Sequence, residues 1–132
     1  MKPHLTENKA RGNLGERAAV GYLRRRFYRI LERNWFFYHK EIDIIARKKD
    51  LLVICEVKTR SRDEGSPYGP ASRAVDAQKQ KNLLIAARGY AKMIGWTKSI
   101  RMDVIEVYLS KKPKKSRPAV KRIVHIKSAF TA

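Results

Sequence analysis

Hydrophobic positions near the start of the chain repeat at helical spacing. Over residues 14–26, apolar side chains recur every three or four positions and would form one stripe of an amphipathic helix. Asn13 and Glu16 match a capping box, in which each side chain accepts a hydrogen bond from the other residue's backbone N–H. This pattern predicts a helix that begins at Asn13, while continuation through Gly12 would let it begin near Thr6.

The pattern then changes to one that is typical of β-strands. Three segments rich in β-branched and aromatic residues cover residues 29–37, 41–47 and 51–58. The short polar link at residues 48–50 predicts an antiparallel hairpin between the second and third segments. The third segment is apolar on both faces as far as Glu56, which is typical of a central strand covered on two sides.

The second half of the chain adds one helix and one or two strands. Residues 76–94 carry another apolar stripe, and Gly95 is placed to end that helix. Residues 100–109 alternate as a fourth strand, and residues 123–126 would add a short edge strand. The predicted architecture is α/β: a mixed sheet of four to five strands flanked by helices, in the order helix, three strands, helix, strand.

Two polar stretches interrupt these elements. Residues 60–70 contain four glycines and prolines and predict a loop, and residues 111–118 predict a basic linker. A chain of 132 residues fits one domain. We therefore expect a single domain over residues 1–109, followed by a basic C-terminal extension over residues 110–132 that includes the short strand.

The net charge narrows the choice of partners. The chain has 31 Lys and Arg against 12 Asp and Glu, so its formal net charge is +19 at pH 7. A polyanion would relieve this self-repulsion, which makes nucleic acid the first candidate and an anionic membrane surface the second. No apolar segment is long enough for a membrane span or a signal peptide, so we expect a cytoplasmic protein without membrane attachment. The single cysteine, Cys55, excludes an internal disulfide and a multi-cysteine zinc site.

Acidic residues and one lysine gather on two neighbouring predicted strands. Residues two apart on a strand point to the same face, so Glu41 shares a face with Asp43, and Glu56 shares one with Lys58. If the hairpin brings these faces together, two or three carboxylates will lie beside one ammonium group. Such carboxylates repel one another unless a proton or a cation lies between them, and an all-oxygen set favours Mg²⁺ or Mn²⁺.

This combination suits the hydrolysis of phosphodiester bonds. A bound divalent cation offsets charge on the phosphate and lowers the pKa of a coordinated water. A nearby lysine can orient or deprotonate that water, or it can stabilise the charge that develops in the transition state. The alternative is a set of cross-strand ion pairs on an exposed face that has no part in chemistry.

The spacing of these residues resembles the PD-(D/E)xK nuclease motif, because Asp43 is followed after twelve residues by Glu56-Val57-Lys58. A wider match resembles the YraN family, small bacterial proteins with a predicted restriction-endonuclease-like fold that is similar to archaeal Holliday-junction resolvases. It extends from about residue 12 to about residue 109. The matching segments are Gly15-Glu-Arg-Ala-Ala, Leu31-Glu-Arg-Asn-Trp, Glu41-Ile-Asp-Ile-Ile-Ala, Glu56-Val-Lys-Thr-Arg, Lys79-Gln-Lys and Arg101-Met-Asp-Val-Ile.

The resemblance implies a role for each matching residue of the motif. Asp43 and Glu56 would be the metal ligands, with the Val57 carbonyl as a third, and the metal would be Mg²⁺ or Mn²⁺. Lys58 would be the catalytic lysine. Glu16 would be the additional acid found in resolvase-like members, although the capping box explains this residue equally well.

Basic and polar residues around the motif would contact nucleic acid. Lys79 and Gln80, at the start of the second helix, would approach phosphate or water, although both also fit an ordinary helix surface. Arg60 follows the motif directly and would bind nucleic acid. Lys40 departs from the family, which usually has glycine before the Glu-x-Asp segment, and a lysine there would alter the turn or contact DNA.

Together these residues predict a magnesium-dependent endonuclease that hydrolyses DNA. The alternative is a non-catalytic module that binds nucleic acid with a nuclease fold, and a third hypothesis is an adaptor that uses the basic tail. Paired carboxylates oppose the binding of a polyanion unless a cation lies between them, which favours the enzyme. Cutting a junction would call for a homodimer with two active sites.

Overall fold

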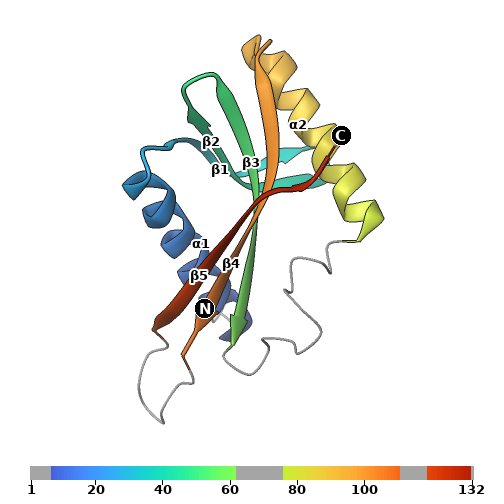
Figure 1. The fold of residues 1–132 in the computed structure, drawn as a ribbon. Coiled ribbons are helices and arrows are strands. Elements are labelled where there is room, and N and C mark those ends of the chain that lie inside the picture. The colour runs from blue at the N-terminus through green and yellow to red at the C-terminus, as the bar shows by residue number, and fades with distance from the viewer. Residues whose placement is uncertain (1–6, 62–75, 111–118, 132) are drawn as a thin grey trace, which may run out of the picture.

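The fold is a mixed β-sheet with one helix on each face (Figure 1). The computed structural model describes residues 7–61, 76–110 and 119–131. The predicted α/β class and the mixed sheet flanked by helices are confirmed, with five strands in the sheet. In chain order the elements are α1 (Glu7–Arg25), β1 (Arg29–Phe37), β2 (Lys40–Lys48), β3 (Leu51–Ser61), α2 (Ala77–Ile94), β4 (Ser99–Leu109) and β5 (Val120–Phe130).

The order of the strands in the sheet follows the chain, β1-β2-β3-β4-β5. Neighbouring strands are antiparallel except β3 and β4, which are parallel and are connected through α2. A parallel pair requires such a crossover because its strands begin at the same edge of the sheet. The predicted hairpin of β2 and β3 is confirmed, with Lys48 and Leu51 as the last pair before the turn.

Two hydrophobic layers bury the faces of the sheet. Strand β3 contributes to both of them, with Val53 and Cys55 facing α1 and Leu52 and Ile54 facing α2, which confirms that it is a central strand. Burial raises the pKa of the Cys55 thiol, as expected for an inert core cysteine. The α1 layer also contains Leu23, Ile44, Ile105 and Leu109, and the α2 layer contains Ile42, Leu83, Tyr90 and Met102.

Helix α1 begins at Glu7, so the start near residue 6 is confirmed and the capping box at Asn13 is wrong. A single glycine inside a helix costs only about 1 kcal/mol relative to alanine, so Gly12 does not end α1. The helix lies very close to β3. A Cβ built on Gly15 would clash with the Thr59 hydroxyl, so only glycine permits this approach. Because the helix begins before Gly12, Glu16 does not cap its N-terminus, and the Glu16 side chain can contact the sheet.

Strand β2 exceeds its predicted limits by one residue at each end and β4 by one residue at its start, and two other strands exceed theirs by more. Strand β3 continues through Arg60 to Ser61, so the predicted loop at residues 60–70 is wrong for its first two positions, and its remainder lies outside the described residues. Strand β5 has eleven residues instead of four and pairs with β4 along its length. It is an edge strand that is exposed at many positions, so it does not show the alternation of a half-buried strand.

The predicted linker at residues 111–118 also lies outside the described residues. No described helix is long and apolar enough to cross a membrane.

Candidate active site

The sheet is irregular around Asp43. Asn34 and Asp43 are not paired with each other, although the positions on both sides of them pair regularly between β1 and β2. The pairing of β2 with β3 ends at Ile44 and Cys55. Beyond that point the Asp43 side chain replaces a backbone partner, because its Oδ2 accepts a hydrogen bond of 2.8 Å from the Val57 N–H. The carboxylate is therefore fixed in the gap where β2 and β3 separate.

The alternation of side chains along β2 is also interrupted at this point. Ile44 packs in the α1 layer, whereas Ile42 and Ile45 both pack in the α2 layer. In a regular strand, positions 42 and 44 would share a face. The two-residue rule therefore does not hold strictly between Glu41 and Asp43, yet their side chains do interact, and a hydrogen bond between them helps to raise the pKa of Asp43.

Glu56 is the buried acid of the site, with 6% of its surface exposed. Its Oε1 lies 3.9 Å from the Lys58 ammonium, and its Oε2 lies 3.7 Å from the Lys79 ammonium. The Lys79–Glu56 ion pair is too long to be a hydrogen bond. No described residue donates a hydrogen bond to Glu56 Oε2. A buried carboxylate oxygen without a donor is unfavourable, so this atom is an open position for a cation or a substrate group.

Burial raises the pKa values of both central acids, while a hydrogen bond with Asp43 lowers the pKa of Glu56. Burial is the largest cause for Asp43 and raises its pKa to about 8, helped by the nearby charge of Glu56 and opposed by the Val57 N–H. Burial also raises the pKa of Glu56, while the Lys79 and Lys58 ammonium groups lower it. Without a cation, these shifts favour a proton held between the two carboxyl groups at neutral pH.

Helix α1 brings a further acid, Glu16, to the same region. The Asn34 side-chain amide donates a 2.6 Å hydrogen bond to Glu16 Oε1, and the charge of Glu16 contributes to the raised pKa of Asp43. Asn34 has a positive φ of 48°, a conformation that Asn tolerates better than most residues. Sequence reasoning did not assign Asn34 to the site. The available signal was a residue of poor strand propensity inside a predicted strand.

The predicted basic residues lie at different positions around these acids. Lys79 is held in the first turn of α2 by Asp76, whose side chain accepts from the Lys79 N–H at 2.7 Å. Gln80 is in the same turn, where its N–H donates to the Asp76 carbonyl at 2.9 Å. Lys40 pairs regularly with Phe37 in the sheet and has no positive φ, so this position does not require glycine.

Arg60 lies two residues beyond Lys58 on β3 and is half-buried. Its Nε is buried and has no hydrogen-bond partner among the described residues. The structure therefore gathers Asp43, Glu56, Lys58, Lys79 and Glu16 around one point. Within the described ranges, neither Lys40 nor Arg60 forms an ion pair with these acids.

The donor atoms at this point fit a hard divalent cation. Asp43 and Glu56 provide carboxylate oxygens and Val57 provides a backbone carbonyl, a set without nitrogen or sulfur. A cation would replace the proton on Asp43 and would satisfy Glu56 Oε2. In the described part of the chain, no three His, Cys, Asp or Glu side chains could hold an ion together. Water or substrate oxygens would therefore complete the coordination, as Mg²⁺ commonly requires.

A second buried polar cluster, which the sequence did not predict, joins β4 to β5 and α1. Asp103 is 1% exposed and accepts hydrogen bonds from Arg101 at 2.7 and 2.8 Å. His125 lies 2.7 Å from the same carboxylate and 3.3 Å from the Tyr22 hydroxyl. Burial alone would raise the pKa of Asp103, but the hydrogen bonds from His125 and Arg101 outweigh it and lower the pKa. These contacts stabilise the fold on the α1 face.

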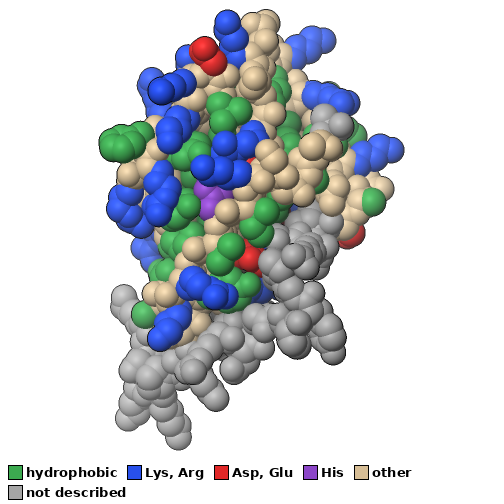
Figure 2. Space-filling view, in the orientation of Figure 1, with side chains coloured by type: hydrophobic (Ala, Val, Ile, Leu, Met, Phe, Trp, Pro, Cys, Tyr) green, Lys and Arg blue, Asp and Glu red, His purple; other side chains and the backbone are tan. Residues whose placement is uncertain are grey.

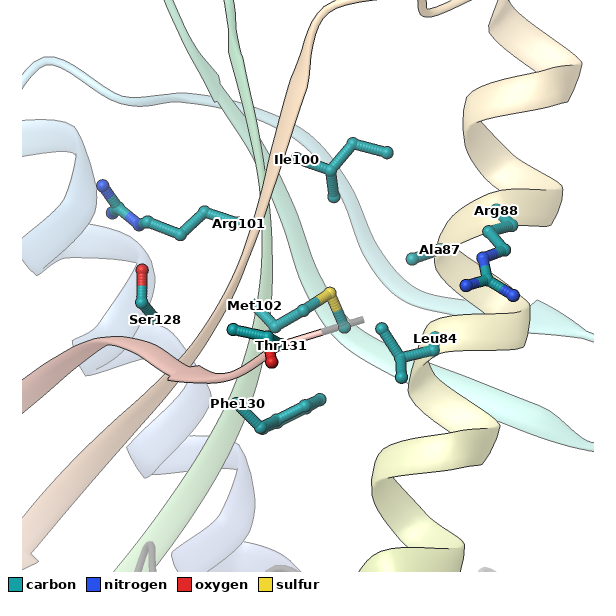
Figure 3. Close-up of a pocket in the computed structure, with 9 residues that line it drawn as sticks. All are labelled: Leu84, Ala87, Arg88, Ile100, Arg101, Met102, Ser128, Phe130 and Thr131. Carbon is teal, nitrogen blue, oxygen red and sulfur yellow. The ribbon is translucent and has the colours of Figure 1, made fainter.

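A hollow of about 180 Å³ lies between α2 and the strands β4 and β5 (Figure 3). In Figure 3, the guanidinium of Arg101 points away from α2, while Met102 and Leu84 approach each other across the hollow. No acidic side chain of the described residues lines it, so it is distinct from the acid cluster. The lining residues are Leu84, Ala87, Arg88, Ile100, Arg101, Met102, Ser128, Phe130 and Thr131.

Comparison with known proteins places the chain in a family. Residues 15–107 match the uncharacterised protein family UPF0102. A UPF0102 protein of Bacteroides fragilis is 39% identical over 96% of this chain and 96% of its own length. Relatives from Acetivibrio thermocellus and Clostridioides difficile are 43% and 38% identical, and the matches cover 92% and 93% of this chain and 92% and 98% of the relatives. The chain therefore belongs to the uncharacterised family UPF0102, the YraN family that its motifs resemble.

Proposed function

We propose that this protein is a divalent-cation-dependent endonuclease that hydrolyses phosphodiester bonds of DNA at Asp43, Glu56 and Lys58. One observation carries the proposal: a buried and a half-buried carboxylate with raised pKa values lie beside an ammonium group, and one carboxylate oxygen has no donor among the described residues. This arrangement opposes folding when nothing is bound. Strongly perturbed acids with specific charged partners are typical of functional sites.

Each group in the site has a task in phosphodiester hydrolysis. Asp43, Glu56 and the Val57 carbonyl would hold Mg²⁺ or Mn²⁺. When bound, the cation would offset phosphate charge and make its coordinated water more acidic. The Lys58 ammonium, 3.9 Å from Glu56, would orient the attacking water or stabilise the charge that develops on the phosphate.

Lys79 would bind the substrate from the other side of Glu56. Its side chain is 41% exposed, compared with 27% for Lys58, so its ammonium is the more accessible to a phosphate that arrives from solvent. It also lies in the first turn of α2, near the positive end of the helix dipole, which favours an anion.

The charge of the whole molecule supports a polyanionic substrate. Figure 2 shows many Lys and Arg side chains and few acids over one face of the molecule. The formal net charge of +19 would attract the phosphate backbone at long range. Binding should therefore weaken steeply as salt rises, because each neutralised phosphate releases a counterion.

Cleavage of labelled single-stranded, branched and duplex DNA in Mg²⁺ or Mn²⁺ tests the proposal. We expect products that disappear on chelation, and a cleavage rate that is lower by more than about 100-fold in Glu56→Gln. Mutating residues that only hydrogen-bond to metal ligands already lowers activity or metal affinity by about 10- to 100-fold. Asp50→Asn is the matched control, since Asp50 is an exposed acid in the β2–β3 turn.

Three outcomes would decide between the hypotheses. Cleavage that survives both chelation and Glu56→Gln would contradict the proposed mechanism. Salt-sensitive DNA binding without product in any metal would contradict catalysis and favour the non-catalytic binding module. Absence of both binding and cleavage would contradict both hypotheses.

A further inference from the structure

An exposed aromatic ring lies beside the acid cluster. Phe36 is 58% exposed and pairs directly with Glu41 across β1 and β2. In antiparallel strands, the Cβ atoms of such a pair lie about 4.5–5.5 Å apart and the side chains share a face. Glu41 in turn hydrogen-bonds to Asp43 and contributes to the raised pKa of Glu56. Only one side chain therefore separates the Phe36 ring from the proposed metal ligands.

The neighbours of Phe36 hold this part of β1 in place. Trp35 and Phe37 pack in the α2 layer, with their rings stacked 6.1 Å apart and Trp35 edge-on to Tyr90. Phe37 also fills the space beside Gly89, where a Cβ would come within 2.5 Å of the ring. Alternation along the strand therefore fixes Phe36 on the opposite face, outside the core.

The turn that follows extends this exposed aromatic surface. Tyr38 is 81% exposed, and its ring meets the ring of Phe37 edge-on at 4.8 Å. Its φ is +56°, a region that is uncommon for a bulky side chain and that persists only where the surroundings enforce it. The hairpin thus presents aromatic side chains to solvent at the end of β1 nearest the acids.

We propose, on the basis of the nuclease function above, that Phe36 stacks on an unpaired base next to the scissile phosphate. The π-faces of bases inside a duplex are covered by their neighbours, whereas those in single strands are open to an aromatic ring. A base next to the scissile phosphate lies within reach of a ring that borders the metal ligands. The site therefore selects single-stranded DNA, or unpaired segments of branched DNA, over continuous duplex.

The chain contains a matched control for this ring. Phe27 is 85% exposed and is also a phenylalanine, but it lies in the turn before β1, at the opposite end of that strand from Phe36. A general effect of exposed aromatic surface on DNA binding would involve both rings. Stacking beside the site involves only Phe36.

Binding in Ca²⁺, measured by fluorescence anisotropy, tests the proposal without requiring cleavage. The probes are a labelled single strand and a duplex of the same sequence. We expect Phe36→Ala to weaken single-strand binding roughly 5- to 100-fold and to leave duplex binding within about twofold. Phe36→Trp should retain single-strand binding, and Phe27→Ala should change neither. A 2-aminopurine base in the strand should be quenched by the wild-type protein and not by Phe36→Ala.

Several results would overturn the proposal. These are an unchanged single-strand affinity in Phe36→Ala, an equal loss for duplex and single strand, or an equal loss in Phe27→Ala. A change in oligomeric mass in Phe36→Ala, with single-strand binding intact, would show that the ring contacts protein instead. Binding that depends on the Phe36 ring without any cleavage would support base stacking and contradict only the nuclease function. Cleavage with no preference between single-stranded and duplex DNA would support the nuclease function and contradict base stacking.

Discussion

Asp43→Asn is expected to abolish cleavage while making the cation-free protein more stable. The loss of a proposed metal ligand should lower the cleavage rate by more than about 100-fold. Mutating residues that only support metal ligands already lowers activity or metal affinity by about 10- to 100-fold. The gain in stability arises because Asp43 is half-buried beside the charge of Glu56, an arrangement that opposes ionisation. The amide oxygen of Asn can still accept the hydrogen bond from the Val57 N–H.

The stability gain should depend on pH in a defined direction. The pKa of Asp43 is raised from 3.8 to about 8 by folding. Between these values the folded protein holds a proton that the unfolded chain has released, so the stability of the wild-type protein falls as pH rises through this window. Asn at this position does not titrate. We expect Asp43→Asn to raise the free energy of unfolding by roughly 2–4 kcal/mol at pH 8 and by little at pH 4.

Urea unfolding of both proteins at pH 4, 6 and 8, in the presence of a chelator, measures this difference. Asp50→Asn serves again as the control and should show no such trend, because Asp50 is exposed. An Asp43→Asn protein that is less stable than the wild-type protein at pH 8 would contradict the buried acid pair.

Asp103→Ala is expected to destabilise the fold by about 3–5 kcal/mol, because it removes a buried carboxylate that accepts several hydrogen bonds and leaves the partly buried Arg101 guanidinium without its partner. The change removes the carboxylate that binds Arg101, His125 and the Ser128 N–H. The pKa of Asp103 is lowered in the folded protein, so its contribution is fully present above about pH 4 and is lost as pH falls further. The difference between the two proteins should therefore shrink in acid.

Urea unfolding at pH 7 and at pH 3 tests this second prediction. Asp103→Asn keeps the shape of the side chain and should cost less than Asp103→Ala. Replacing Arg101 by Met in the Asp103→Ala background should recover part of the loss, since the unpaired guanidinium is then removed. A loss below about 1 kcal/mol at pH 7 would show that the cluster does not stabilise the fold.

Local patterns predicted most of the fold. Strand β1 was predicted with its observed limits, and α2 ends at Gly95, whose φ of 69° is the left-handed conformation expected of a glycine C-cap. The start of α1 was harder to predict, because the capping signal at Asn13 competed with continuation of the helix through Gly12. Strand β5 was underestimated because an exposed, basic edge strand has little hydrophobic alternation.

Local patterns predicted less of the site. The approach of Asp43 to Glu56 follows from hairpin pairing, which the sequence indicates. The contacts of Asn34 with Glu16 and of Lys79 with Glu56 depend on how the helices pack on the sheet, so spacing alone does not reveal them. The interruption of β2 at Asp43 is also invisible in the sequence, because a strand is expected to alternate without a break.

Calorimetric titration of Mn²⁺ into the metal-free protein at pH 7 tests the central claim most directly. Because the raised pKa values favour a proton held by the Asp43–Glu56 pair in the absence of a cation, binding should release about one proton, which is measured by repeating the titration in buffers of different ionisation enthalpy. We predict a site that binds Mn²⁺ with this proton release in the wild-type protein and in Asp50→Asn, and that is lost in Asp43→Asn and in Glu56→Gln. No binding by the wild-type protein, or equal binding by all four proteins, would contradict the claim that these acids form a metal site.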